Sequence, residues 1–202
     1  MIDPPSILAL LTFDAYLGVP MPSYCEYVLA HPEDTYHQVY HDTAYGFPLD
    51  DDNALFERLM LEINQAGLSW TTILKKADNF RRAYSHFDVA RVASYGQRDM
   101  DRLLADAGII RNRLKVNAAI QNAHRIRDLQ REHGTFKAWL DAHHPSSLDD
   151  WTRLFKSTFT FTGSKIVAEF LISTGYLRGA HDQTCPVYAR VLKLGPPWAI
   201  IK

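Results

Sequence analysis

Two cysteines and two histidines carry side chains that could hold a metal ion. Cys25 and His41 lie in the first quarter of the chain, and His181 and Cys185 lie near its end. Thiolates and neutral imidazoles are preferred ligands of zinc, and four of them close a tetrahedral structural site. Since the chain holds nine histidines, a histidine four residues from a cysteine also arises by chance. Spacing alone leaves both explanations open.

These are the only two cysteines of the chain, so a disulfide framework is excluded and burial, reactivity or metal ligation remain. The sequence also has no Gly-rich phosphate loop, no nucleophile elbow and no Ser/His/Asp order typical of a hydrolase triad.

A single carboxylate, Glu62, interrupts an apolar stripe. It follows Leu55 and Leu59 and precedes Ala66, at the spacing of one helix face. A carboxylate buried without partners costs several kcal/mol or takes up a proton, so its position needs a reason. One reason is a structural ion pair or helix cap, and the other is recognition of a polar ligand in an apolar pocket.

Several aromatic residues lie close in sequence to Glu62 and to the metal-ligand candidates. Flat apolar faces with polar edges suit a pocket that stacks a nucleobase, although aromatic residues more often belong to a core. The residues concerned are Tyr27, Tyr36, Tyr40, Tyr45 and Trp70.

The elements that would position these residues are helices. Residues 50–52 supply N-caps for a helix that continues to Gly67, and Ser69 then caps a second helix containing Trp70, Ile73, Leu74 and Phe80. A further helix through Leu103 and Leu104 is expected to end at Gly108 and to be followed by a long one. This is a helix-hairpin-helix candidate, with Leu114, Val116, Ile120, Ala123, Ile126 and Leu129 on the buried side of the long helix.

Near the end of the chain, residues 151–155 and 164–174 are helical in pattern. The alternation over 158–163 could form a short strand, but one too isolated to make a sheet. We therefore predict an all-α fold.

Composition and charge restrict the class of protein. The chain has 202 residues, 47% hydrophobic and 22% charged, which suits one soluble globular domain. The apolar run 7–11 is too short to cross a bilayer, so we expect a cytoplasmic protein. Residues 1–60 have a charge balance of −9 and residues 61–202 one of +8. This asymmetry points weakly to an anionic partner such as nucleic acid, and solvated helix faces are the alternative.

Four segments together resemble the 3-methyladenine DNA glycosylase I family of the helix-hairpin-helix superfamily. They are Tyr40-His41-Asp42, the run from Leu61 to Trp70, Ile73-Leu74-Lys75-Lys76, and the run from Ala107 to Arg113. The resemblance covers residues 23–185. We therefore expect a single helical domain over residues 23–202, preceded by an N-terminal extension, residues 1–22. His181 and Cys185 stand where that family completes a zinc site.

The resemblance implies a DNA repair enzyme that removes 3-methyladenine from alkylated DNA by hydrolysing the N-glycosidic bond. The damaged nucleotide would flip into a pocket, where Trp70 stacks on the base and Glu62 and Tyr40 act on its edge. Because N3-methylation makes the base cationic, a carboxylate in a low-dielectric pocket favours it over ordinary adenine. Free 3-methyladenine is the implied product.

The resemblance also implies how the protein holds DNA and metal. Backbone N–H groups from Gly108 to Arg113 would contact a phosphate, helped by basic residues. The basic residues are Lys75, Lys76, Arg111, Arg113 and Lys115. Cys25, His41, His181 and Cys185 would bind one structural Zn²⁺, and we expect a monomer without a membrane partner.

The chain departs from the family pattern at two aromatic positions, where Tyr27 and Tyr45 replace usual tryptophans. Two other functions remain alternatives: a zinc-stabilised helix-hairpin-helix DNA-binding module without catalytic activity, and a small-molecule binding protein that uses the Glu62 pocket. A glycosylase assay separates them.

Overall fold

A computed structural model describes residues 22–200, and within this range the chain is helical and contains no strand. The helices are α1 (Tyr24–Ala30), α2 (Thr35–Thr43), α3 (Asp52–Gln65), α4 (Trp70–Ala83), α5 (Val89–Ala93), α6 (Gln97–Ala105), α7 (Arg113–His133), α8 (Phe136–His143), α9 (Leu148–Thr158), α10 (Ser164–Ser173) and α11 (Pro186–Lys193), with 3₁₀ turns η2 (Ser85–Phe87) and η3 (Pro197–Ala199). The all-α prediction is confirmed for these residues. The expected extension, residues 1–22, lies outside the described residues except for its last one.

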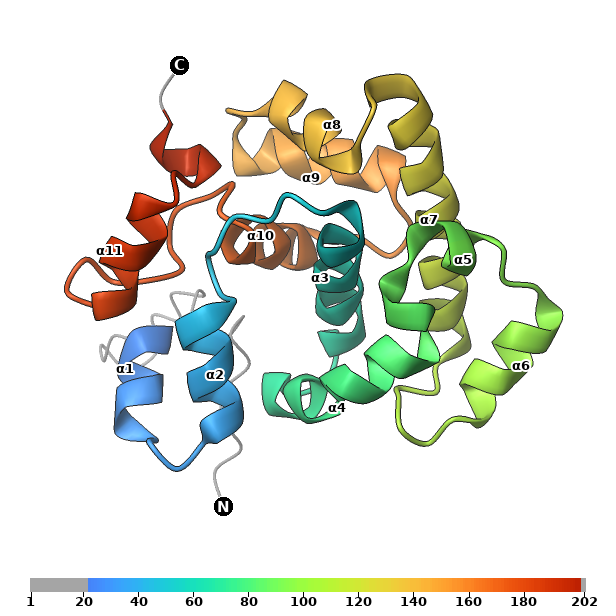
Figure 1. Ribbon diagram of the computed structural model, residues 1–202, viewed down its shortest axis with the longest axis horizontal. Helices are drawn as coiled ribbons and strands as arrows, with labels where there is room; N and C mark the ends of the chain where they lie inside the picture. Colours follow the sequence, from blue (N-terminus) through green and yellow to red (C-terminus); the bar gives the residue numbers. More distant parts are fainter. Residues whose placement is uncertain (1–21, 201–202) are drawn as a thin grey trace.

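Helix α3 is the centre of the fold, with α4, α7, α8 and α10 packed around it (Figure 1). Its N-terminus is capped as expected, because the Asp51 side chain accepts a hydrogen bond from the Ala54 N–H at 2.9 Å. Ten of its residues are buried, including Phe56 and Ile63, which flank the expected stripe. Ala66 was expected on the buried stripe and is instead exposed, because the helix ends at Gln65.

The turn between α3 and α4 follows the sequence expectation. Gly67 adopts a left-handed φ of 81°, which favours glycine. The Ser69 hydroxyl then accepts a hydrogen bond from the Thr72 N–H at 3.2 Å and caps α4. Trp70 therefore starts a new helix one short turn after the end of the helix that carries Glu62.

Helices α6 and α7 form the expected hairpin, with two corrections. Helix α6 ends at Ala105 rather than at Gly108, because Asp106 takes over the turn and accepts a hydrogen bond from the Gly108 N–H at 2.7 Å. Leu114 was expected on the buried side of α7 but is 67% exposed, because it occupies the first turn of that helix, beyond the neighbouring core. The remaining expected positions are buried, apart from the half-buried Ile120.

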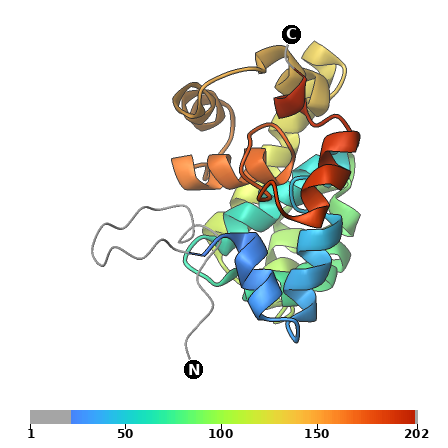
Figure 2. The same ribbon diagram turned by 90° about the vertical axis from the view of Figure 1, so that its left-hand side faces the viewer.

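The C-terminal helices close the molecule. Helix α10 packs between α9 and α3, and α11 lies next to the α1–α2 pair in both views (Figures 1 and 2). The 158–163 stretch forms no strand: Thr158 ends α9, and Phe161 has a positive φ of 67° that breaks extended backbone. Over residues 22–200 no helix combines the length and apolar character needed to cross a membrane.

Candidate functional site

Tyr40 and Trp70, which are 30 positions apart in the sequence, meet where α2 packs on α4. Their ring centroids are 5.1 Å apart, edge to face, and both side chains are buried. The ring of Tyr45 lies 5.6 Å from that of Tyr40 on its other side. The structure thus assembles three of the five aromatic residues singled out from the sequence into one cluster.

Glu62 is buried in the same region, with 3% of its surface exposed. Burial is the main reason why the pKa of its carboxyl lies well above the usual range; the nearby Glu169 raises it further and Arg58 opposes the shift. Arg58 stands one turn earlier on α3, and its guanidinium lies 5.1 Å from the centroid of the Tyr40 ring. Among the described residues Glu62 forms no ion pair within 4.0 Å, and Arg58 is the nearby positive charge that lowers its pKa.

Two charged residues of this region, Arg58 and Glu169, were missed by the sequence analysis. The Arg58 guanidinium donates to the Ser173 carbonyl at 2.9 Å, tying α3 to α10. Glu169 stands one turn before Ser173 on α10 and is 1% exposed. Its isolation among apolar residues, Ile166-Val167-Ala168 before it and Phe170-Leu171-Ile172 after it, was the available signal.

Several buried polar atoms of this cluster have no hydrogen-bond partner among the described residues. They include the Tyr40 hydroxyl, one oxygen of Glu169, the Trp70 indole N–H and the Gln65 amide. Buried polar atoms are almost always paired in native proteins, so a group of unpaired ones marks a place where a ligand or water completes the bonding. A donor and acceptor set beside an aromatic face can recognise a planar polar base.

A surface cleft of about 260 Å³ elsewhere in the molecule is a weaker candidate for a ligand site. It is lined by Asp141 and Tyr176, among others. There the Tyr176 hydroxyl donates to Asp141 at 2.7 Å and Lys137 donates to the same carboxylate at 2.7 Å. Because these polar groups already satisfy one another, we place the candidate base site at the Glu62 cluster.

The other two aromatic candidates have different surroundings. Tyr27 stacks on His31 with centroids 4.3 Å apart and meets His37 edge-on at 5.1 Å. Tyr36 is half exposed and lies beside Lys75 on the surface. Tyr36 therefore belongs to the outer face of α2 and not to the buried cluster.

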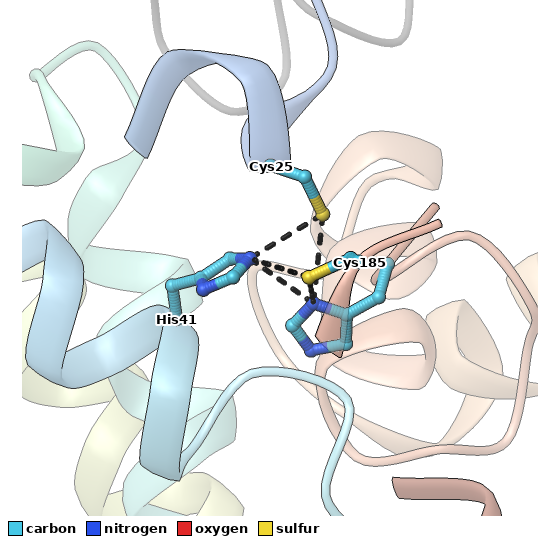
Figure 3. A group of neighbouring side chains, drawn as sticks. Cys25, His41 and Cys185 are labelled. Carbon is cyan, nitrogen blue, oxygen red and sulfur yellow. Dashed lines mark hydrogen bonds between the residues drawn. The ribbon is translucent and has the colours of Figure 1, made fainter. Parts of the chain in front are cut away.

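The four predicted metal ligands converge from both ends of the described chain. Figure 3 shows Cys25, His41 and Cys185 pointing toward one another. His41 Nε2 lies 3.3 Å from Cys25 Sγ, 3.2 Å from His181 Nδ1 and 3.7 Å from Cys185 Sγ, and all four ligand atoms lie within 4.8 Å of one another. A tetrahedral zinc ion requires N–N separations of about 3.3 Å and N–S separations of about 3.6 Å. The spacing fits a tetrahedral ion of that size.

The second ring nitrogen of each histidine is held in a way that suits ligation. His181 Nε2 donates to the Tyr45 carbonyl at 2.7 Å, so its Nδ1 presents a lone pair to the cluster. His41 Nδ1 donates to Asp42 at 2.7 Å, so its Nε2 does the same. The Asp182 N–H donates to Cys25 Sγ at 3.4 Å, which suits a thiolate.

Burial shifts the pKa of two of the four candidate ligands. It lowers the pKa of His181 to about 4 and, together with Cys185, raises that of the Cys25 thiol to about 12. A bound cation would reverse the second effect, because metal ligation displaces the thiol proton. The described residues thus form a candidate metal site with two imidazoles and two thiols.

The hairpin between α6 and α7 presents basic residues, although part of it is bonded internally. Arg111 and Arg113 are exposed there. Gly108 approaches α4 so closely that an added Cβ would lie 3.3 Å from Asn79. Lys76 donates to the carbonyls of Ala107 and Gly108 at 3.0 and 3.2 Å, so it braces the hairpin from α4.

Lys115 was expected to contact DNA phosphates, and the structure corrects this. Its side chain is buried, and its ammonium donates to the carbonyls of Asn64 and Ala66 at 2.8 and 2.7 Å. These carbonyls lie at the C-terminal end of α3, where a cation satisfies unpaired acceptors and complements the helix dipole. Burial lowers the pKa of Lys115. Lys115 therefore caps α3 and holds the hairpin helix against it.

This correction predicts different effects for two lysines. Lys115→Met should lower the free energy of unfolding by about 1–3 kcal/mol, because two acceptors lose their donor. The salt dependence of DNA binding should not change. The exposed Lys75→Met is the matched control, with unchanged stability. Denaturant titration and DNA binding at several salt concentrations test both, and a Lys115→Met variant that is stable but has a reduced salt slope would restore the phosphate role.

Comparison with known proteins gives a family match and similar curated proteins. The family model for methyladenine glycosylases matches residues 30–152. DNA-3-methyladenine glycosylase 1 of Escherichia coli (strain K12) is 35% identical over 146 residues, covering 71% of this chain and 78% of that protein. DNA-3-methyladenine glycosylase of Haemophilus influenzae is 43% identical over 84 residues, covering 42% of this chain and 45% of its own.

Solved structures give the same result for the fold. The structure of 3-methyladenine DNA glycosylase I from Staphylococcus aureus, described for its recognition of 3-methyladenine, superposes with a TM-score of 0.70 at 32% identity. The match covers 75% of this chain and 90% of that one. Sequence and fold therefore agree that this chain belongs to the methyladenine glycosylase family.

Proposed function

We propose that this protein is a monofunctional DNA glycosylase that releases 3-methyladenine from alkylated DNA, the first step of base excision repair. The observation that carries the proposal is the buried cluster of Glu62, Tyr40 and Trp70, with polar atoms left unpaired in a chain of this family. The direct test is to incubate the protein with methylated DNA and identify released bases by chromatography. Release of 3-methyladenine is the expected result.

The cluster suits this chemistry because the substrate base is cationic. N3-methylation places a positive charge on the base and weakens its bond to the sugar, so the enzyme must mainly select and position it. A flipped base would stack on Trp70, with the carboxylate of Glu62 and the hydroxyl of Tyr40 at its edge. In a low-dielectric site a carboxylate attracts such a cation far more strongly than in water.

Double-stranded DNA would lie along the hairpin side of the molecule. The backbone around Gly108 and the exposed Arg111 and Arg113 would contact phosphates, which carry no sequence information and suit a search for rare lesions. Lys75 would add charge. A monomer with residues 23–202 as one domain is sufficient for this arrangement.

We propose zinc as the occupant of the Cys25, His41, His181 and Cys185 cluster. Two thiols and two imidazoles at tetrahedral spacing, with both outer ring nitrogens held by oxygen acceptors, support this assignment. All four ligands come from the protein, so the ion would be structural. It would tie α1 and α2 to the segment before α11.

The stacking role of Trp70 predicts a difference between two substitutions. Because Trp70 is 1% exposed, alanine would leave a large cavity, whereas Trp70→Phe and Trp70→Leu both keep an apolar filling. Only phenylalanine keeps a flat face. We expect Trp70→Leu to bind free 3-methyladenine about 5- to 100-fold more weakly than Trp70→Phe.

Calorimetry with free 3-methyladenine measures this difference, and affinity for undamaged duplex DNA serves as the control, since stacking acts only after flipping. Equal affinities of the two variants for the base would remove the stacking role and leave Trp70 as a core residue.

A DNA-binding module without catalytic activity is the alternative function. It would bind methylated DNA without releasing any base. The named relatives are glycosylases, which favours the enzyme.

A further inference from the structure

The Glu62 cluster contains a second buried carboxylate, that of Glu169. Its side chain lies on α10, where all its neighbours in sequence are apolar. The Tyr45 hydroxyl donates to one of its oxygens at 3.3 Å, and the other oxygen has no partner among the described residues. A carboxylate 1% exposed with a free oxygen is costly unless a ligand uses it.

Helix packing places Glu169 with Glu62. Arg58 of α3 donates to Ser173 of α10 at 2.9 Å. Glu62 follows Arg58 by one turn and Glu169 precedes Ser173 by one turn, so the crossing of the two helices brings both carboxylates to Tyr40. The Tyr45 ring, which contacts both Tyr40 and Glu169, connects the pair to the aromatic cluster.

The charges of this group do not balance when both carboxylates are ionised. Arg58 supplies one positive charge against two negative ones. A neutral ligand leaves one buried negative charge uncompensated, whereas a cationic ligand compensates it. The site therefore matches a planar ligand with one positive charge.

We propose that Glu169 is a specificity-determining residue of the base pocket, and that Glu62 and Glu169 together select bases that carry a positive charge over neutral bases. This proposal rests on the proposed function and deepens it. It assigns discrimination between methylated and ordinary adenine to a pair of carboxylates on two helices.

The pair also couples base binding to a proton. Burial raises the pKa of Glu169 to about 7, and the hydroxyl of Tyr45 opposes the shift. Near Glu169 stand Glu62 of α3, Tyr40 of α2 and Tyr45, and Arg58 of α3 bonds to Ser173 one turn further along α10. The acidic and basic residues of α9 are exposed. Because burial raises the pKa of both carboxyls, binding of a cationic base favours loss of a proton from the pair.

Two free ligands allow a cationic and a neutral methylated adenine to be compared. The 3,9-dimethyladeninium ion is permanently cationic and has a methyl group in place of the sugar, and 3-methyladenine is its neutral counterpart. At pH 8 we expect Glu169→Gln to lower affinity for the cation tenfold or more and to change affinity for the neutral base less than about threefold. Glu132→Gln, an exposed glutamate on α7, is the charge-matched control and should behave as wild type.

A pH series adds a measurement that would not change with pH if Glu169 had only a structural role. Wild-type affinity for the cation should rise up to about tenfold from pH 6 to pH 8, because the carboxyl of Glu169, with its pKa raised to about 7, loses its proton over that range. In Glu169→Gln this rise should be smaller, because the titration of Glu169 is removed, and an unchanged rise would contradict the proposal. Glu169→Ser is the second variant, and a melting temperature near that of wild type shows that each variant is folded.

The outcomes distinguish a failure of this proposal from a failure of the proposed function. If the wild type binds neither ligand and releases no base from methylated DNA, the proposed function fails and Glu169 selectivity fails with it. If the wild type binds both ligands while folded Glu169→Gln and Glu169→Ser weaken both equally, or neither, only the selectivity of Glu169 is overturned.

Discussion

Replacing Glu62 with glutamine is expected to slow release of 3-methyladenine from alkylated DNA about ten- to a hundredfold. The substitution keeps the side-chain volume and removes the charge, and losing a charge-assisted hydrogen bond in a buried pocket costs about 1.5–3 kcal/mol. Single-turnover base release, measured by chromatography, gives the effect. Affinity for undamaged DNA should barely change.

Stability provides the control for this variant. Because burial and the nearby Glu169 both disfavour an ionised Glu62, removing the charge of Glu62 should leave the melting temperature unchanged or higher. If Glu62 served only as an ion-pair partner of Arg58, the melting temperature and every activity would fall together. Wild-type excision by a stable Glu62→Gln protein would end the pocket assignment.

Removing one metal ligand is expected to have the largest effect on stability. Cys25→Ala should release the ion and lower the melting temperature by about 10 °C. A ligand present at a thousandfold excess over its Kd stabilises the folded state by about 4 kcal/mol, and this stabilisation is lost with the ion. For a chain of this size each kcal/mol shifts the melting temperature by about 2–4 °C. Elemental analysis and calorimetry on the same preparation measure both effects.

Chelation supplies an internal check. A strong chelator should bring the wild-type melting temperature down to that of Cys25→Ala and should not affect the variant. Base release should persist in the variant below its melting temperature, because the proposed ion is structural. Protein purified without chelator that contains no stoichiometric zinc would refute the assignment.

The sequence by itself determined the local elements and the residues that start and end them. Asp51 and Ser69 cap their helices because the side-chain oxygen of each reaches a backbone N–H three residues ahead. Gly67 takes its left-handed turn for an equally local reason. The metal quartet and the Glu62–Trp70 segment could also be picked out, because their residue types carry the chemistry.

Only the tertiary structure decided which side chains are buried and what surrounds them. Lys115 occurs in a basic stretch, and nothing within a few residues of it indicates that its ammonium reaches carbonyls about 50 positions away. Arg58 bonds to Ser173, one turn after Glu169, through the crossing of α3 and α10, which are separated by some hundred residues. Hydrogen-bonded caps depend on neighbours along the chain, whereas burial and charge balance depend on helices packed from distant segments. The sequence marked Glu169 only as an isolated charge, and its proximity to Glu62 became visible only in the folded protein.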